Sequence, residues 1–174
     1  MKTISFIGGG RITRILAQAF NNANVRFDKV VVYDVSEEAL KAVKAKFPQV
    51  TTTTSVDEAA TAELVILSVH PPMVMETIEK IKGSLQPGSV LLSLAPKFTI
   101  EKLTALLGGF ANIARMNPSA STIVNKGVNP VSFSASFDAD KKKAFLELFR
   151  PLGYEPEVAD NKIEAYAVIS AMGH

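Results

Sequence analysis

The chain begins with a short apolar run that leads directly into a glycine turn and then into an amphipathic helical pattern. The run is residues 4–7, the turn is Gly8-Gly9-Gly10, and apolar positions recur with helical spacing over residues 12–23. Gly8 permits a tight turn, and Gly10 lets a ligand approach the backbone because it has no Cβ. The unpaired amide groups that begin the helix then attract an anion. This order of parts predicts a phosphate-binding turn between a strand and a helix.

A second apolar run ends in an acidic residue, Asp34, at about the spacing where a carboxylate binds a ribose diol. Together with the glycine turn, this spacing favours a dinucleotide-binding site. The pattern Gly8-x-Gly10-x-x-Thr13 lacks the third glycine of the usual fingerprint, and both the turn and Asp34 also have purely structural interpretations. Asp34 favours NAD because a carboxylate repels a 2′-phosphate, whereas Arg11 and Arg14 favour NADP. Arg11 at the helix start indicates a phosphate contact, and a solvated arginine is the equal alternative. The expected cofactor is therefore NADP or NAD, with no preference between them.

Composition excludes several classes of function. The net charge is +2, so neither nucleic acid nor an anionic membrane is an expected partner, and a small-molecule substrate is. The chain has no cysteine, which excludes thiolate catalysis and fits a cytoplasmic location. The longest apolar run, residues 64–69, has the length of a strand rather than of a membrane span. The two histidines are far apart and no carboxylate cluster stands near His70, so no metal site is expected.

Strand and helix patterns alternate along the whole chain. Ser36 and Thr99 are the expected N-caps of two helices, Asp138 or Asp140 opens another, and Asp160 caps a helix that begins at Asn161. The alternation predicts an α/β fold, a doubly wound and mostly parallel sheet with helices on both faces. After the first strand, we expect strands at residues 29–33, 50–54, 64–69, 89–94, 111–116, 128–134 (an edge strand, because it contains Pro130) and 154–158.

In such a sheet the ligand binds at the carboxyl ends of the strands. Residues 8–13, 34–36, 69–71 and 94–96 should lie along this edge, and residues 117–121 should approach it. The candidate cofactor-binding residues are Gly8, Gly9, Gly10, Arg11, Ile12, Thr13, Asp34, Ser36, Val69, His70, Pro71, Ala95 and Asn117.

Two of these candidates keep alternative interpretations. His70 is either a strand-end histidine hydrogen-bonded to a loop or a group beside the nicotinamide or its ribose, and a general-acid role is the least favoured. Asn117, with Ser119 and Ser121, either stabilises a loop or contacts the nicotinamide or the substrate. The sequence does not identify catalytic residues.

The last residues are apolar on most sides of the expected helix, from Tyr166 onward. An exposed apolar helix is an unusual free end, so we expect it to lead into another domain or to be covered by a partner. We divide the chain into residues 1–160, a dinucleotide-binding domain, and residues 161–174, the start of a linker helix. The chain would then be a fragment of a longer protein, or a protein that buries this helix by forming a homo-oligomer.

Taken together, these motifs resemble those of the pyrroline-5-carboxylate reductase family. The resemblance covers essentially the whole chain. The stretches that carry it are Phe6-Ile7-Gly8-Gly9-Gly10, Leu67-Ser68-Val69-His70-Pro71, Ser93-Leu94-Ala95, Arg115-Met116-Asn117-Pro118-Ser119, Gly127, Phe149-Arg150-Pro151-Leu152-Gly153 and residues 165–173.

The resemblance implies an N-terminal Rossmann domain for NADPH or NADH and a second, helical domain that makes the dimer and supplies most of the substrate pocket. It implies reduction of a cyclic imine to proline, in proline biosynthesis. Arg11 and Thr13 depart from the family pattern, so we expect cofactor contacts to differ there. The alternatives are a dinucleotide-binding module without catalysis and a related reductase, either F420-dependent or of the β-hydroxyacid dehydrogenase type.

Overall fold

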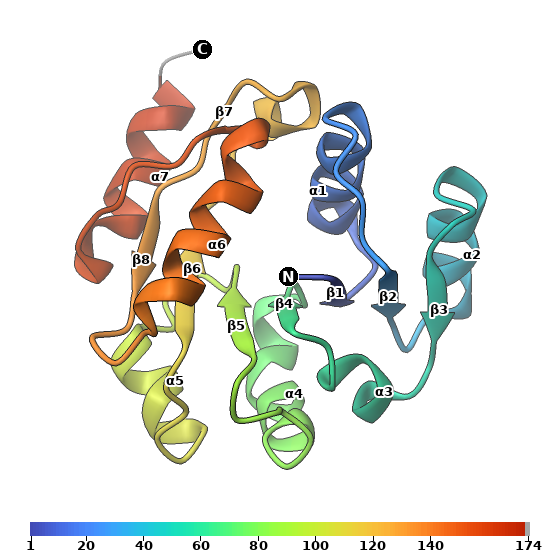
Figure 1. Ribbon diagram of the computed structural model, residues 1–174, viewed down its shortest axis with the longest axis horizontal. Helices are drawn as coiled ribbons and strands as arrows, with labels where there is room; N and C mark the ends of the chain where they lie inside the picture. The colour runs from blue at the N-terminus through green and yellow to red at the C-terminus, as the bar shows by residue number, and fades with distance from the viewer. Residues whose placement is uncertain (173–174) are drawn as a thin grey trace.

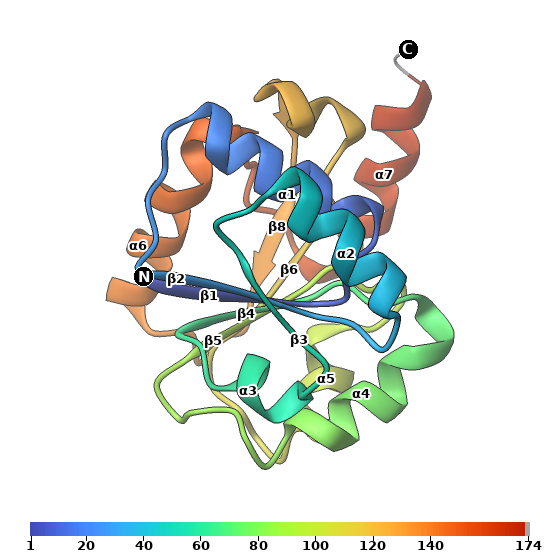
Figure 2. The ribbon, with the colours of Figure 1, turned by 90° about the vertical axis from the view of Figure 1, so that its right-hand side faces the viewer.

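The computed structural model describes residues 1–172. Within them, a seven-stranded sheet has the order β3-β2-β1-β4-β5-β6-β8 and carries helices on both faces (Figures 1 and 2). All neighbouring strands are parallel except β6 and β8, which are antiparallel. The expected doubly wound α/β fold is confirmed. The strands are β1 (Thr3–Ile7), β2 (Lys29–Tyr33), β3 (Thr51–Thr53), β4 (Leu64–Leu67), β5 (Val90–Ser93), β6 (Ile113–Met116) and β8 (Val131–Phe133).

The helices form two layers, one on each face of the sheet (Figure 2). One layer contains α1 (Arg11–Asn22), α2 (Glu37–Lys46) and α6 (Ala139–Phe149); the other contains α3 (Val56–Ala60), α4 (Val74–Ile81) and α5 (Ile100–Leu106). The short 3₁₀ helices are η1 (Pro71–Met73), η2 (Ala120–Val124), η3 (Arg150–Leu152) and η4 (Asp160–Lys162), and the last helix is α7 (Ile163–Met172).

Strand β4 shows why the sheet is covered on both faces. Successive side chains of a strand point to opposite faces. Leu64 and Ile66 pack in the core beneath α1 and α6, and Val65 and Leu67 pack in the core beneath α3 and α4. Every residue of β4 is buried, which a central strand of a parallel sheet requires.

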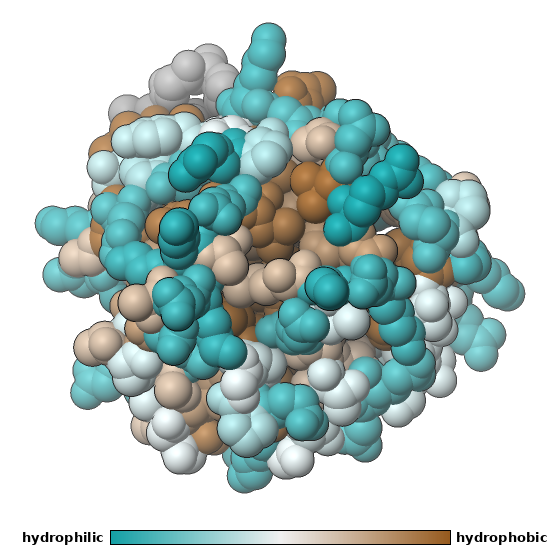
Figure 3. All heavy atoms as spheres, viewed as in Figure 1, coloured by the Kyte–Doolittle hydropathy of each residue, from teal (hydrophilic) through white to brown (hydrophobic). Residues whose placement is uncertain are grey.

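Aromatic side chains join two helices of the first layer. Phe20 of α1 packs edge-to-face on Phe149 of α6, with ring centroids 5.6 Å apart. Figure 3 shows hydrophilic side chains around the periphery of this face and apolar surface near its centre, between the positions of α1 and α6 in Figure 1. These contacts fix α1 against the sheet, and the amino end of α1 is the part that faces the glycine turn.

Strands β3, β4, β5 and β6 are each two residues shorter than predicted, and two further expected strands differ more. Residues 128–134 divide into β7 (Gly127–Val128) and β8, and residues 154–158 give only β9 (Gly153–Tyr154) and a bridge at Glu157. Strands β7 and β9 form a separate two-stranded sheet. Pro130 interrupts the first stretch because proline has no amide hydrogen for a strand ladder. The expected edge position of this stretch is confirmed, since β8 ends the large sheet.

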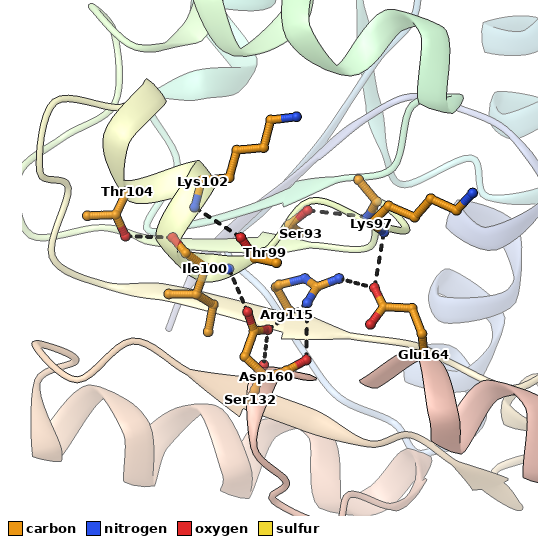
Figure 4. A network of polar contacts seen from close by, with 11 residues as sticks. Ser93, Lys97, Thr99, Ile100, Lys102, Thr104, Arg115, Ser132, Asp160 and Glu164 are labelled. Carbon is orange, nitrogen blue, oxygen red and sulfur yellow. Dashed lines mark hydrogen bonds and ion pairs between the residues drawn. The ribbon is translucent and has the colours of Figure 1, made fainter. Parts of the chain in front are cut away.

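A buried arginine ties the last helices to the sheet (Figure 4). Arg115 of β6 is 1% exposed. Its guanidinium donates to Oδ1 of Asp160 at 2.6 Å and to Oε1 of Glu164 at 2.5 Å. Asp160 lies in η4 and Glu164 in the first turn of α7. Because a buried guanidinium requires charged partners, this pair of carboxylates fixes where α7 begins.

The role predicted for Asp160 is wrong in one respect. Asp160 does not cap its own helix, whose N-cap is Ala159. Its carboxylate accepts hydrogen bonds from the amide of Ile100, the first residue of α5, and from the hydroxyl of Ser132 in β8. Asp160 therefore joins β6, β8, α5 and η4. The predicted caps at Ser36, Thr99 and Asp138 are confirmed, since each side chain accepts a backbone amide of its helix.

Replacement of Arg115 by methionine tests this network. We expect Arg115→Met to lower the free energy of unfolding by about 2–3 kcal/mol, because two carboxylates lose their shared cation. Arg26→Met, at an exposed arginine, is the matched control and should change stability by less than about 0.5 kcal/mol. Urea unfolding measures both variants, and equal stability of the two would contradict the anchoring role of Arg115.

The network also predicts a pH dependence. Burial alone would raise the pKa of Glu164, but hydrogen bonds from Arg115 and from the amide of Lys97 outweigh it and lower that pKa below 4.5. The stabilisation from ionised Glu164 is therefore complete above the unfolded-state pKa and is lost as the pH falls below it. The stability difference between the unmodified protein and Glu164→Gln should shrink from about pH 7 to about pH 3, measured by urea unfolding. A difference that grows over this range would refute the assignment.

Candidate cofactor-binding site

The order of the strands reverses between β1 and β4, and a cavity opens at the carboxyl ends of these two strands. Strands β2 and β3 lie on one side of this point, and β5, β6 and β8 lie on the other (Figure 1). The cavity has a volume of about 500 Å³. Such a switch point is where doubly wound sheets bind their ligands, because the loops diverge there.

Gly8 brings three strand ends close together. Its φ of +116° is unfavourable for a residue with a side chain, and a Cβ on it would lie 2.7 Å from the carbonyl oxygen of Ser68. The amide of Gly8 donates to the carbonyl of Tyr33 at the end of β2. The turn therefore packs directly on the backbone that follows β4.

Thr13 supports this turn from beneath. Its side chain is fully buried, and its hydroxyl donates to the carbonyl oxygen of Gly8 at 2.5 Å. The hydroxyl also lies 2.9 Å from that of Ser68, whose own hydroxyl donates to the carbonyls of Ile7 and Gly8. Thr13 stands where the usual fingerprint has its third glycine, and its hydroxyl stabilises the turn through a hydrogen bond.

Gly10 and the first turn of α1 form a place for an anion. A Cβ on Gly10 would meet no other atom within 4 Å, so the space above it is open. Gly10 is the N-cap of a 12-residue helix and has no side chain to accept the first amides, and the first turn contains no acidic residue. The helix dipole and these amides attract negative charge. Arg11, exposed at the first position, adds a positive charge at the same point.

Asp34 connects the glycine turn to the loop after β2. Its carboxylate accepts the amide of Gly9 through Oδ2 and the amide of Ser36 through Oδ1, both at 2.8 Å. Ser36 in turn accepts the amide of Ala39 and so caps α2. Asp34 also lines the cavity, so the turn interpretation and the ligand interpretation of this residue are compatible.

The opposite wall comes from the segment after β4 and from α4. Met73, the last residue of η1, lines the cavity together with Thr77 and Lys80, which are three residues apart and lie on one face of α4. Val69, His70 and Pro71 line it as well. The imidazole of His70 is exposed, and no hydrogen bond to it occurs within residues 1–172. This disfavours the loop-bonded interpretation of that histidine.

The structure brings together most of the predicted residues. The cavity is lined by eight of them: Gly8, Gly10, Arg11, Ile12, Asp34, Val69, His70 and Pro71. The other five do not line it: Gly9, Thr13 and Ser36 support the lining residues as described above. Ala95 is buried beside Ser93, and the amide of Asn117 donates to Pro130. The role of all thirteen predicted residues in cofactor binding stays a prediction.

Several lining residues were not predicted. Pro118 and Ala120 belong to residues 117–121, the segment expected to approach this edge, and they line the cavity, whereas Asn117 does not. Thr77 and Lys80 lie in a helix rather than at a strand end, and only their helical spacing from Met73 could have indicated them. The remaining unpredicted lining residues are Ile15, Tyr33, Val35, Ser68 and Met73.

Two features are not found in the described part of the chain, a membrane-spanning helix and a metal-binding cluster. None of the helices within residues 1–172 combines the length and apolar character of a membrane span. In the same range, no cluster of three or more histidine, aspartate or glutamate side chains is arranged to hold a metal ion.

The first half of the chain matches a known family model. Residues 3–97 match the family described as NADP oxidoreductase, coenzyme F420-dependent. This range contains the glycine turn, Asp34 and the whole segment from β4 to the end of β5.

Individual proteins are similar over nearly the whole chain. A pyrroline-5-carboxylate reductase of Corynebacterium melassecola is 27% identical over 173 residues, which is 98% of this chain and 64% of that protein. The structure of a pyrroline-5-carboxylate reductase from Coxiella burnetii has a TM-score of 0.86 and 27% identity, over 98% of this chain and 64% of the other. That of the Plasmodium falciparum pyrroline carboxylate reductase with NADP bound has a TM-score of 0.84 and 22% identity, over 98% and 63%. The chain thus spans a little under two thirds of the length of these relatives.

Gly10 offers a test of the cavity with a matched control. We expect Gly10→Val to weaken binding of a nicotinamide dinucleotide at least about a hundredfold, because its side chain fills the space above the helix amides. A Cβ on Gly83 would likewise meet no atom within 4 Å, and Gly83 does not line the cavity. Gly83→Val should therefore bind as the unmodified protein does. Calorimetric titration measures binding and thermal unfolding verifies folding, and retained affinity in folded Gly10→Val would exclude this site.

Proposed function

The chain belongs to the family described as NADP oxidoreductase, coenzyme F420-dependent, and we propose that it is the dinucleotide-binding part of a reductase of the pyrroline-5-carboxylate type. The observation that carries the proposal is the cavity at the β1–β4 switch point, where the glycine turn, an uncapped helix start and Asp34 converge. The family confirms the expected class of cofactor, a nicotinamide dinucleotide.

The residues of the cavity fit such a cofactor in its separate parts. We assign the pyrophosphate to Gly8, Gly10 and the amides that begin α1, with Arg11 as an additional cation. We assign the adenosine ribose to Asp34, at the end of β2. The nicotinamide end is assigned to the apolar side of the cavity, at Val69 and Pro118. Gly9, Thr13 and Ser36 hold these groups in place through the hydrogen bonds described above.

The proposed reaction is reduction of a cyclic imine to proline. When bound, the reduced cofactor would supply a hydride to the imine carbon, and a proton on the imine nitrogen would complete the amine. The described residues bind and orient the cofactor, which is a large part of the catalytic task because alignment removes an entropic cost. His70 lines the cavity and directly follows Val69, one of the residues assigned to the nicotinamide end. The similarity to pyrroline-5-carboxylate reductases along 98% of this chain supports this substrate class.

A second candidate differs in the reacting partner. The family's description names coenzyme F420, so hydride exchange between NADP and a deazaflavin is the alternative reaction. The same cavity would hold the dinucleotide in either case. The two candidates differ in the hydride acceptor, and an assay separates them.

We extend the proposal to assembly and location. Residues 1–160 would form the binding domain and residues 161–174 would open a helix toward a helical domain through which two copies associate. The exposure of Val168 and Ile169 in α7, 60% and 66%, supports a covering partner for this helix. The absence of cysteine supports a reducing compartment, the cytoplasm.

Hydride transfer to each acceptor tests the function. This chain alone is expected to be incomplete for catalysis, because the helical domain would supply most of the substrate pocket. Assayed together with that domain, the protein should oxidise NADH or NADPH in the presence of pyrroline-5-carboxylate, measured by loss of cofactor absorbance, and should leave oxidised F420 unchanged. Oxidation with F420 alone would favour the second candidate. With the helical domain present, cofactor binding without turnover of either acceptor would favour a binding module, and absence of cofactor binding would refute both reductase proposals.

A further inference from the structure

We propose that this chain selects NADH over NADPH, and that Asp34 is the residue that determines the selection. The inference rests on the proposed function, since it concerns the same cavity. It goes beyond that function because the family's description names NADP, whereas the charges on the adenosine side of the cavity disfavour a 2′-phosphate.

The first observation is how Asp34 is held. The amides of Gly9 and Ser36 each donate to a different oxygen of its carboxylate at 2.8 Å. These bonds fix the carboxylate at the cavity wall, at the end of β2. Each carboxylate oxygen has a second lone pair and can still accept a ribose hydroxyl. A 2′-phosphate in place of that hydroxyl would offer no donor and would bring two negative charges against the carboxylate.

The second observation is the charge of the loop that follows. Residues 34–40 read Asp-Val-Ser-Glu-Glu-Ala-Leu and contain no lysine or arginine. Glu37 and Glu38 occupy the exposed first turn of α2, beside the Ser36 cap. A site for a 2′-phosphate places a cation near this loop. Here the loop has three carboxylates, so the local field opposes that phosphate.

Neither of the two lysine and arginine side chains that line the cavity is assigned to the 2′ position of the ribose. Arg11 and Lys80 are the lysine and arginine side chains that line it. Arg11 lies at the start of α1, on the side of the pyrophosphate. Lys80 forms an exposed ion pair with Glu76 of its own helix, with Nζ and Oε1 2.6 Å apart, so a carboxylate accompanies this cation. His70 also lines the cavity and follows β4.

Val35 permits a test that leaves the Asp34 hydrogen bonds in place. Its side chain lines the cavity and is 70% exposed, so a longer side chain fits there without repacking the core. Val35→Arg would place a cation beside the ribose. Val124 is the matched control, because it is also apolar and exposed, 59%, and does not line the cavity.

The experiment is calorimetric titration of NADH and NADPH, and of ADP and 2′-phospho-ADP, which isolate the adenosine half. We expect NADH to bind at least about tenfold more tightly than NADPH, with the same order for the two ADP compounds. Asp34→Asn and Val35→Arg should each reduce this ratio about tenfold or more, and Val124→Arg should leave it unchanged. Val35→Arg keeps the test valid if Asp34→Asn does not fold.

Three outcomes would overturn the inference while the proposed function stands. They are equal or tighter binding of NADPH, an unchanged ratio in folded Asp34→Asn and Val35→Arg, and a selective loss of NADPH binding in Lys80→Met. The last would mean that Lys80 holds a 2′-phosphate. Failure of both cofactors to bind is a different result, because it refutes the cavity assignment and therefore the proposed function.

Discussion

The close approach of the glycine turn to the backbone after β4 is the constraint on which the rest of the site depends. Gly8 can lie against Ser68 only because it has no Cβ, and its amide is hydrogen-bonded to the end of β2. This contact brings the carboxyl ends of β1, β2 and β4 to one place. The amino end of α1 and the carboxylate of Asp34 then face one cavity, although they belong to different βα units. Without that approach, the helix amides and Asp34 would not act on one ligand.

Much of this arrangement follows from the sequence, because short-range patterns determine it. Alternating apolar runs and caps located the strands and helices, and the strand-end rule placed Gly10, Asp34 and His70 at one edge. The buried position of Arg115 and its pairing with Asp160 were not predicted. The two residues are 45 positions apart, and no periodicity relates them. The short β7–β9 sheet was missed for a similar reason, since each strand has only two residues.

The backbone groups proposed to bind the phosphates and the side chains proposed to select the cofactor are separate features of the cavity. The range that matches the family model, residues 3–97, contains most of the cavity, and its glycine turn is the proposed phosphate site, with backbone amides as donors. Backbone amides serve NAD and NADP equally, so this shared feature does not determine which one binds. The difference arises from a few side chains at the end of β2, which can change while the turn is retained. A family description and the preference of one member can therefore diverge at Asp34.

The Arg115 network holds α7 by its first turn. Arg115 forms one ion pair with Glu164, in the first turn of α7, and another with Asp160, in the preceding η4. Further along α7, Val168 and Ile169 are largely exposed. With a rise of about 1.5 Å per residue, a small rotation at the anchored turn becomes a larger displacement at the far end. The direction of α7 is therefore set at its first turn, by the ion pair to Arg115 of β6 and by the hydrogen bond from the amide of Lys97, in the β5–α5 loop, to Glu164.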